Sequence, residues 1–321
     1  MLFTDVLLLL VGLIVLVKGA DLLVDGASSI AARFGVPPLV VGLTIVSFGT
    51  SLPEMLVTLT SGLRHNADLA IANVIGSNIF NVLVVLGVAA VIRPLPVRDS
   101  TVVSEIPFSL TAALLVGFLA NASLFAMPGV LSISRLDGGI LLFFFLLFML
   151  YVYGVARDGR LESVQRIETR TLTRSLLYIA AGVVALYFGG QWTVDGAVGL
   201  ARDLGVDDAL IGLTIVAIGT SAPELVASAV AAYRGQTDIA VGNVVGSNIF
   251  NLLWILGFTA AIVELPFEVV SNTDLVMVIM ASAMVILALV TSGSGRILRA
   301  HGVVFIGAYL AYLAYVIQRS I

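Results

Sequence analysis

The sequence contains two copies of one motif, and this repetition limits the folds open to the chain. Residues 42–54 read GLTIVSFGTSLPE and residues 212–224 read GLTIVAIGTSAPE, with 10 of 13 positions identical at an offset of 170. At the same offset, NVIGSNIFN at residues 73–81 matches NVVGSNIFN at residues 243–251 in all but one position. The chain therefore consists of two related halves, each carrying both motifs.

Long apolar segments fill both halves. The 321 residues are 60% hydrophobic and 11% charged, whereas soluble domains carry roughly 25% charged residues. Many segments reach about the 20 residues that a helix needs to cross a bilayer, and they are too long and uniform for a β-barrel. We expect an all-α polytopic membrane protein with ten transmembrane helices. Their approximate bounds are 3–31, 38–62, 68–92, 105–125, 137–155, 173–200, 208–232, 238–262, 273–292 and 301–318.

Five spans in each half mean that the two halves enter the membrane in opposite senses. We therefore expect two inverted five-helix repeats, residues 1–156 and 173–321, joined by a cytoplasmic linker at residues 157–172. This architecture is typical of secondary transporters, whose binding site lies near the bilayer midplane and is formed by discontinuous helices.

Arginine placement orients the chain in the membrane. If the linker is cytoplasmic, the inside loops hold 11 arginines, and the outside loops and the C-terminus hold 4. The positive-inside rule then places both termini on the outer side of the cell membrane.

Residue types exclude several kinds of chemistry. The chain has no cysteine, which excludes disulfides, thiolate nucleophiles and cysteine-based metal sites. An intramembrane hydrolase could use Ser51 or Ser221 as its nucleophile, but the two histidines, His65 and His301, lie near predicted loops and no embedded base is evident. We therefore expect no enzymatic activity, no cofactor and no nucleic-acid partner, and we expect the protein to work as a monomer in the lipid bilayer.

Each motif places polar side chains on one face of a helix. At helical spacing, the first motif and its repeat contain Ser47, Thr50, Ser51 and Glu54, and Ala217, Thr220, Ser221 and Glu224. The second motif and its repeat contain Asn73, Ser77 and Asn81, and Asn243, Ser247 and Asn251. If these four faces converge, they enclose a small cavity lined almost wholly by oxygen atoms.

Proline adds further oxygen acceptors. Because Pro53 has no N–H, the carbonyl of Gly49 loses its helical partner, and the helix is expected to bend there. Pro223 has the same effect on the carbonyl of Gly219. Irregular backbone is tolerated at membrane depth where it lines a cavity, so such carbonyls can point at a cation. The carbonyls concerned belong to Gly49, Thr50, Gly219 and Thr220.

Glu54 and Glu224 decide the kind of ligand. A carboxylate at mid-bilayer costs about 2.5–3.5 kcal/mol and marks a functional site, and no buried lysine or arginine is available to pair with either one. The two glutamates must be protonated or neutralised by cations. Calcium accepts about 6–8 oxygen ligands in flexible geometry. Two negative charges balance one Ca²⁺ or two Na⁺, so competition for one site provides a mechanism for exchange.

Other polar residues admit a supporting role. Asn73 and Asn243 could act as hydrogen-bonding residues between helices. Together with Gly49 and Gly219, they could support the direct ligands without binding the ion themselves. Asp25 and Asp195, which are also related by the offset of 170, lie toward the ends of their spans. We interpret them as helix-end or interhelical polar groups rather than as transport residues.

The paired GTSxPE and GSNIFN motifs resemble the two alpha-repeats of the calcium/cation antiporter superfamily and, within it, the compact prokaryotic sodium/calcium exchangers. The resemblance covers essentially the whole chain. It implies a ten-helix inverted-repeat fold, outward termini, and the exchange of several Na⁺ for one Ca²⁺ by alternating access. The first and sixth helices would slide across the remaining bundle.

The same resemblance implies the ligands of the transported ions. Glu54 and Glu224 would be the main Ca²⁺ ligands, assisted by the carbonyls of Thr50 and Thr220. The Na⁺ sites would combine these glutamates with Ser51, Ser77, Ser221 and Ser247 and with backbone carbonyls near Ser47 and Ala217. Asn81 and Asn251 would complete the centre.

One position departs from some members of that family. Certain exchangers carry aspartate at the place of Asn251, whereas Asn81 and Asn251 are both neutral here. Two central carboxylates remain, which leaves the stoichiometry and any role of protons or potassium open. A Ca²⁺/H⁺ antiporter is the nearest alternative, because buried glutamates can carry protons. The hydroxyl-rich faces favour Na⁺, since protons need no such cage. A passive cation channel is a second alternative, against which inverted repeats and bent helices argue.

Overall fold

The structure is a computed structural model that describes residues 2–97, 104–122, 131–158, 170–205, 217–269 and 271–320. In these ranges, seven helices are long and apolar enough to cross a membrane, and an eighth span results if the bent pair Pro38–Thr50 and Leu52–Leu63 is counted as one. The prediction of an all-helical, polytopic membrane protein is therefore confirmed.

The count of ten spans stays a prediction. The helix at the expected span 105–125 is Glu105–Ala120, which is apolar but has only 16 residues. The expected span 208–232 begins outside the described ranges, which omit residues 206–216. Most of the expected linker, residues 159–169, also lies outside them.

In the described part of the chain, helices follow one another on both sides of the linker. Before the linker they are α1 (Leu2–Phe34), α2 (Pro38–Val41), η1 (Gly42–Val46), α3 (Ser47–Thr50), α4 (Leu52–Leu63), α5 (Ala67–Phe80), η2 (Asn81–Val85), α6 (Leu86–Ile92), α8 (Glu105–Ala120) and α10 (Arg135–Asp158). After it they are α11 (Leu172–Asp203), α13 (Ala217–Thr220), α14 (Ala222–Tyr233), α15 (Thr237–Ile249), η4 (Phe250–Ile255), α16 (Leu256–Ile262), α17 (Ser271–Ser292) and α18 (Arg299–Ser320). Elements marked η are π-helical.

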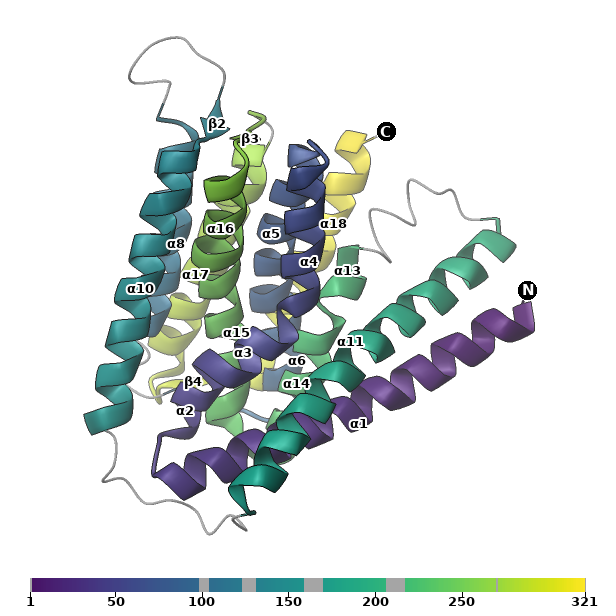
Figure 1. The fold of residues 1–321 in the computed structure, drawn as a ribbon, viewed down its shortest axis with the longest axis vertical. Helices are drawn as coiled ribbons and strands as arrows, with labels where there is room; N and C mark the ends of the chain where they lie inside the picture. Colours follow the sequence, from purple (N-terminus) through teal and green to yellow (C-terminus); the bar gives the residue numbers. More distant parts are fainter. Residues whose placement is uncertain are drawn as a thin grey trace.

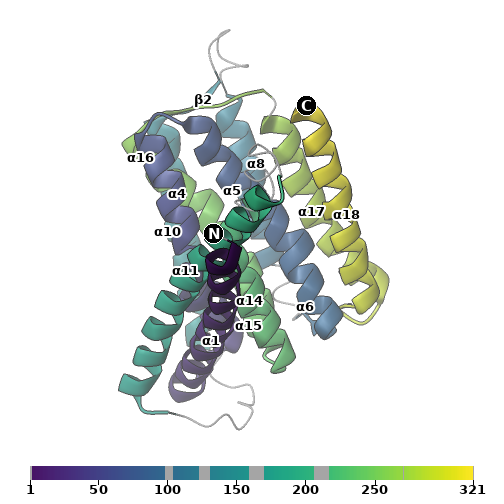
Figure 2. The ribbon, with the colours of Figure 1, turned by 90° about the vertical axis from the view of Figure 1, so that its right-hand side faces the viewer.

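Two long helices pack side by side against an upright bundle. Figures 1 and 2 show α1 and α11 as an inclined pair, while α4, α5, α16 and α18 stand together beside it. At the centre of the bundle lie the continuous helices Ala67–Ile92 and Thr237–Ile262, of whose most apolar stretches 72% and 94% are buried. The core therefore forms around the two helices that carry the second motif.

Glycines let α1 and α11 approach closely. Three glycines in each helix recur every seven residues and face the other helix; this glycine seam consists of Gly12, Gly19, Gly26, Gly182, Gly189 and Gly196. A methyl group added to Gly19 would lie 2.8 Å from the backbone nitrogen of Leu186, and one added to Gly182 would lie 2.6 Å from that of Leu23. Small residues are a usual means of close helix association in membranes. The two helices therefore meet backbone to backbone along this seam.

Each half contains a helix break at its first motif. The segments before and after Ser51 are bent by 49°, and Ser51 itself has φ −85° and ψ 8°. Ser221, between α13 and α14, has nearly the same conformation, with φ −90° and ψ 7°. Pro53 and Pro223 lie in the first turn of the helix that follows, where a missing N–H is tolerated. The bend predicted from Pro53 is present.

The second motifs end in π-helical turns. Asn81 is the first residue of η2, and Asn251 is the second residue of η4. Turns of this kind are rare and occur frequently at functional sites, because they change which side chains face inward. The sequence pattern assumed regular α-helix here, so these turns were not expected.

Two short antiparallel strand pairs join the halves. β1 (Leu95–Pro96) pairs with β4 (Arg296–Ile297), and β2 (Ser132–Ile133) pairs with β3 (Leu265–Pro266). In Figure 1 the β2–β3 pair lies at the upper end of the bundle and β4 lies near its lower end. Each pair connects a loop of the first half to a loop of the second, so both ends of the bundle are tied.

The glycine seam predicts an effect on stability. Gly182→Ala places a methyl group against the backbone of α1, and overpacking of this kind costs about 1–3 kcal/mol. We expect a lower melting temperature in detergent, followed by tryptophan fluorescence. Gly139→Ala in α10 is the matched control, because nothing lies within 4 Å of an added methyl group there. Equal melting temperatures for the two variants would show that the seam is not tightly packed.

Candidate functional site

The two halves meet at two buried carboxylates. Glu54 lies in the first turn of α4 and Glu224 in the first turn of α14, and both are fully buried. The hydroxyl of Ser51 donates to Glu224 Oε1 at 2.8 Å, and the hydroxyl of Ser221 donates to Glu54 Oε1 at 2.9 Å. The serine at each helix break therefore binds the glutamate of the other half.

Ser77 and Ser247, the serines of the second motif, contribute further hydroxyl groups. Ser221 Oγ is also 3.0 Å from the hydroxyl of Ser77, which lies in α5. Ser247, the counterpart of Ser77 in α15, is fully buried and its hydroxyl has no hydrogen-bond partner. The helices of both motifs thus contribute hydroxyl groups to the same region.

Asn73 and Asn243 hold the helices around the glutamates. Asn243 Oδ1 accepts from Thr50 at 3.1 Å, and its Nδ2 donates to Ser228 at 2.9 Å. Asn73 Oδ1 accepts from Thr220 at 3.4 Å, and its Nδ2 donates at 2.9 Å to the hydroxyl of Thr58. The Nδ2 groups also contact the backbone carbonyls of Glu54 (3.2 Å) and Glu224 (3.5 Å). These contacts match the structural role that the sequence left open for the two asparagines.

Thr58 and Ser228 were missed by the sequence analysis. Each lies four residues after a glutamate, on the same helical face, and the two are related by the offset of 170. Both are fully buried. The repeated four-residue spacing could have identified them.

Ser47 and Ala217 each begin the short helix that precedes the break of their half. The hydroxyl of Ser47 donates to the carbonyls of Gly42 (2.7 Å) and Asn243 (3.0 Å), so it is occupied by backbone contacts. Ala217 begins α13. The turns that contain Gly49 and Gly219 immediately precede the breaks at Ser51 and Ser221.

Buried polar atoms without a partner concentrate at the predicted ligands. Among the described residues, twelve buried side-chain nitrogen and oxygen atoms lack a hydrogen bond, and seven of them belong to five predicted ligands. These atoms are Glu54 Oε2, Glu224 Oε2, Ser247 Oγ, and the Oδ1 and Nδ2 atoms of Asn81 and Asn251. Buried polar groups are otherwise almost always paired. The free oxygens are a donor set that suits a hard cation.

The charge at this place is limited to two carboxylates. In the described part of the chain, neither glutamate forms an ion pair with lysine or arginine. No group of three or more His, Asp or Glu side chains there could hold a metal ion. A cation bound between the halves would therefore need hydroxyl, amide and carbonyl oxygens to complete its ligands.

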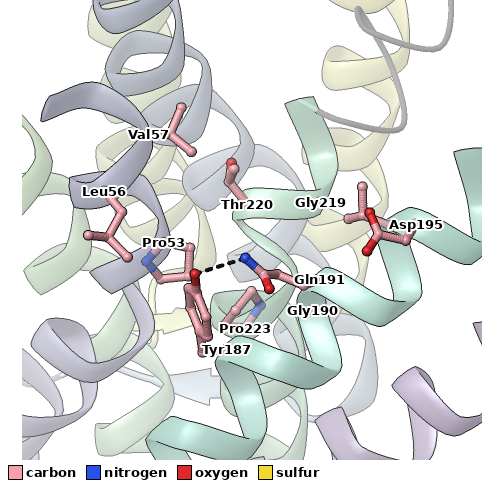
Figure 3. A pocket seen from close by; sticks show the side chains of 11 residues that line it. Pro53, Leu56, Val57, Tyr187, Gly190, Gln191, Asp195, Gly219, Thr220 and Pro223 are labelled. Carbon is pink, nitrogen blue, oxygen red and sulfur yellow. Dashed lines mark hydrogen bonds between the residues drawn. The ribbon is translucent and has the colours of Figure 1, made fainter. Parts of the chain in front are cut away.

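A cavity of about 280 Å³ reaches this region from one side. Its wall is formed by α4, α11, α13 and α14, and Thr220 and Gly219 are part of it (Figure 3). Gln191 lies in the wall and donates to the hydroxyl of Tyr187 at 2.8 Å. Because Thr220 directly precedes Ser221, the cavity comes within one residue of the group that contacts Glu54. The remaining lining residues are Pro53, Leu56, Val57, Gly190, Val194, Asp195 and Pro223.

The helical membrane fold with a buried oxygen site defines a transporter of cations. Residues 4–154 and 174–318 match the family model described as sodium/calcium exchanger protein. The chain therefore belongs to the sodium/calcium exchanger protein family. It is a transporter rather than an enzyme, and its ions are substrates, so that cation/Ca²⁺ antiport across the bilayer follows from the family.

Individual relatives extend over the full chain. The inner membrane protein YrbG of Escherichia coli is 35% identical over 316 residues, which cover 96% of this chain and 95% of that protein. The sodium/calcium exchanger MaX1 of Methanosarcina acetivorans is 30% identical, with 98% of both chains covered. A solved structure of the sodium-calcium exchanger NCX_Mj, soaked with zero Na⁺ and Ca²⁺, has a TM-score of 0.82 at 32% identity and covers 98% of this chain and 99% of that one.

The hydrogen bonds of Asn73 to Thr58 and of Asn243 to Ser228 predict equal effects of mutation on stability in the two halves. Thr58→Val and Ser228→Ala each leave an asparagine Nδ2 short of a partner, which costs about 1–3 kcal/mol. We expect both variants to unfold at lower temperature by a similar amount. Thr60→Val is the control, because the Thr60 hydroxyl is exposed and bonds only its own helix. Loss of stability in the control alone would contradict this assignment.

Proposed function

We propose that the protein is a Na⁺/Ca²⁺ antiporter that extrudes Ca²⁺ with the energy of inward Na⁺ flow. The observation that carries the proposal is the pair of buried glutamates, each bound by the serine of the other half and each with one oxygen free. Two carboxylates can balance one Ca²⁺ or two Na⁺, so the ions compete and cannot occupy the site together. Such competition is what exchange requires.

The ligands follow from this geometry and from the family pattern. Glu54 and Glu224, with the carbonyls of Thr50 and Thr220, would bind Ca²⁺. Na⁺ would use the same glutamates with Ser51, Ser77, Ser221 and Ser247, and with carbonyls near Ser47 and Ala217, while Asn81 and Asn251 complete the centre. The unpaired atoms of Glu54, Glu224, Ser247, Asn81 and Asn251 support this set. Residues that do not bind the ions directly would support these ligands; they are Asn73, Asn243, Gly49 and Gly219.

The transport cycle would rest on ten helices in two inverted repeats, residues 1–156 and 173–321. Contacts that recur at the offset of 170, such as Ser51 with Glu224 and Ser221 with Glu54, support this arrangement. Both termini would face outward and the linker 157–172 the cytoplasm, as the arginine distribution indicates. Alternating access would expose the site to each side in turn, with the chain acting as a monomer.

The choice of Na⁺ over H⁺ rests on hydroxyl groups. Ser51 contacts Glu224, and Ser221 contacts both Glu54 and Ser77, so three hydroxyl groups lie beside the glutamates. A proton would bind a carboxylate without help from these oxygens, whereas Na⁺ needs several oxygen ligands. The relative MaX1 is named a sodium/calcium exchanger. Ca²⁺/H⁺ exchange is the second candidate, because the same buried carboxylates could carry protons.

The direct test is Ca²⁺ flux in proteoliposomes under an imposed Na⁺ gradient, and then under a pH gradient with Na⁺ absent. We expect a Na⁺ gradient to drive Ca²⁺ across the membrane in the direction opposite to Na⁺ flow. We expect no Ca²⁺ flux under the pH gradient. Ca²⁺ flux driven only by the pH gradient would show that the coupling ion is H⁺ rather than Na⁺. Flux without either gradient would indicate a channel.

Loss of either central charge should abolish transport. We expect Glu54→Gln and Glu224→Gln each to reduce Na⁺-dependent Ca²⁺ flux to background, because one carboxylate cannot balance a divalent ion. Glu105→Gln is the matched control: Glu105 is also fully buried, but it lies at the start of α8 and accepts a 2.6 Å hydrogen bond from Tyr151. Retained exchange in either central variant would contradict the proposed site.

A third carboxylate should make exchange sensitive to pH. In Asn251→Asp three acidic groups would share the site, and their mutual repulsion favours binding of a proton. That proton must leave before a cation binds, so exchange should fall more steeply with decreasing pH than in the wild type. Parallel Ca²⁺ flux measurements from pH ~6 to ~8 test this. Identical pH profiles would place residue 251 outside the charged centre.

A further inference from the structure

Two aspartates at equivalent positions of the repeat have opposite surroundings. Asp25 of α1 accepts from Arg170 at 3.1 Å and also pairs with Arg234. Asp21, one turn earlier, pairs with Arg234 at 2.7 Å. These carboxylates are neutralised by arginines, and for Asp25 the predicted interhelical role is confirmed.

Asp195 of α11 has no such neutralising partner in the described part of the chain. It is exposed and lines the cavity of about 280 Å³ between α4, α11, α13 and α14. At the offset of 170, Gln191 replaces Asp21, and Arg64 replaces Arg234. Arg64 is exposed at the end of α4 and forms no ion pair with a described residue. The arginine pairing seen at Asp25 is thus absent at Asp195.

The position of Asp195 links the cavity to the cation site. It is the one charged residue among those that line the cavity in the described structure. The wall also includes Thr220, whose neighbour Ser221 contacts Glu54. A cation in this cavity is therefore near a carboxylate that has no ion-pair partner among the described residues, and within one residue of the group that contacts Glu54.

A charge in a cleft with apolar walls has a longer reach than the same charge on an open surface. The walls focus its field and raise the local concentration of oppositely charged ions. Pro53, Leu56, Val57, Val194 and Pro223 supply apolar walls here. The effect is screened by salt over about 8 Å at physiological ionic strength.

We propose that Asp195 attracts cations into this cavity and so sets the concentration at which they reach the site from this side. The inference rests on the proposed function. Under the proposed orientation the cavity opens to the outside, because Asp195 lies in the half of α11 that is remote from the linker. Asp195 is a positioning residue: it acts on the ions before they bind and does not belong to their final ligands.

The test is Asp195→Asn in right-side-out vesicles, with the concentrations of external Ca²⁺ and Na⁺ for half-maximal exchange as readouts. At low ionic strength we expect the value for Ca²⁺ to rise about threefold, with an unchanged maximal rate. An electrostatic potential acts in proportion to ionic charge, so the fold-change for Ca²⁺ should be the square of that for Na⁺. Added choline chloride should remove both differences.

Two further variants separate this effect from a structural one. Asp203→Asn removes the same charge from the end of the same helix, outside the cavity, and should leave the half-maximal concentrations unchanged. Gln191→Glu adds a charge within the cavity and should lower them. A change in Asp195→Asn that is equal for both ions, or that persists at high salt, would overturn the inference.

The outcomes distinguish this inference from the proposed function. A wild-type protein without Na⁺-dependent Ca²⁺ flux would overturn both. A wild-type exchanger that Glu54→Gln inactivates, and whose half-maximal concentrations do not move in Asp195→Asn, would overturn the role of Asp195 alone.

Discussion

The burial of two carboxylates that have no basic partner in the described part of the chain is the constraint on which this structure depends. Burying a carboxylate away from water is unfavourable unless the charge is paired or neutralised. Glu54 and Glu224 each receive one hydroxyl donor from the opposite half and keep one oxygen free. A permanent arginine would cancel the charge and leave nothing for an ion to neutralise. The two carboxylates therefore depend on the bound cations for neutralisation.

Around this site the contacts fall into two kinds. Asn73 and Asn243 bridge the broken helices through side-chain bonds, and strand pairs tie the two halves at both ends. α1 and α11 meet each other along the glycine seam, where the two backbones approach closely. The seam holds α1 and α11 to each other, so the two helices form one packing unit beside the bundle. That contrast fits a cycle in which the site stays fixed and access to it changes.

The sequence was sufficient to predict the all-helical membrane fold and the bend at Pro53, because hydrophobicity and proline are local signals. It also predicted that polar faces of the two halves meet, and Ser51 contacts Glu224 while Ser221 contacts Glu54. Thr58 and Ser228 were within reach, since their spacing from the glutamates recurs in both halves. The π turns at Asn81 and Asn251 were not, because the four-residue spacing of the polar side chains indicated a regular α-helix. Nor could spacing show that Asp25 pairs with arginine whereas Asp195 faces a cavity. An identical Asp-Gly-Ala motif occurs at both positions, so the motif itself does not distinguish them.

The central claim is that one site, built by both halves, binds either Ca²⁺ or Na⁺. Equilibrium binding of radioactive Ca²⁺ to the purified protein, at increasing Na⁺ concentration, tests it most directly. The account predicts one Ca²⁺ per chain and its complete displacement by Na⁺, with a dependence steeper than that of a single competing ion, because two charges must be balanced. Ca²⁺ binding that is insensitive to Na⁺, or that saturates at more than one ion per chain, would contradict it.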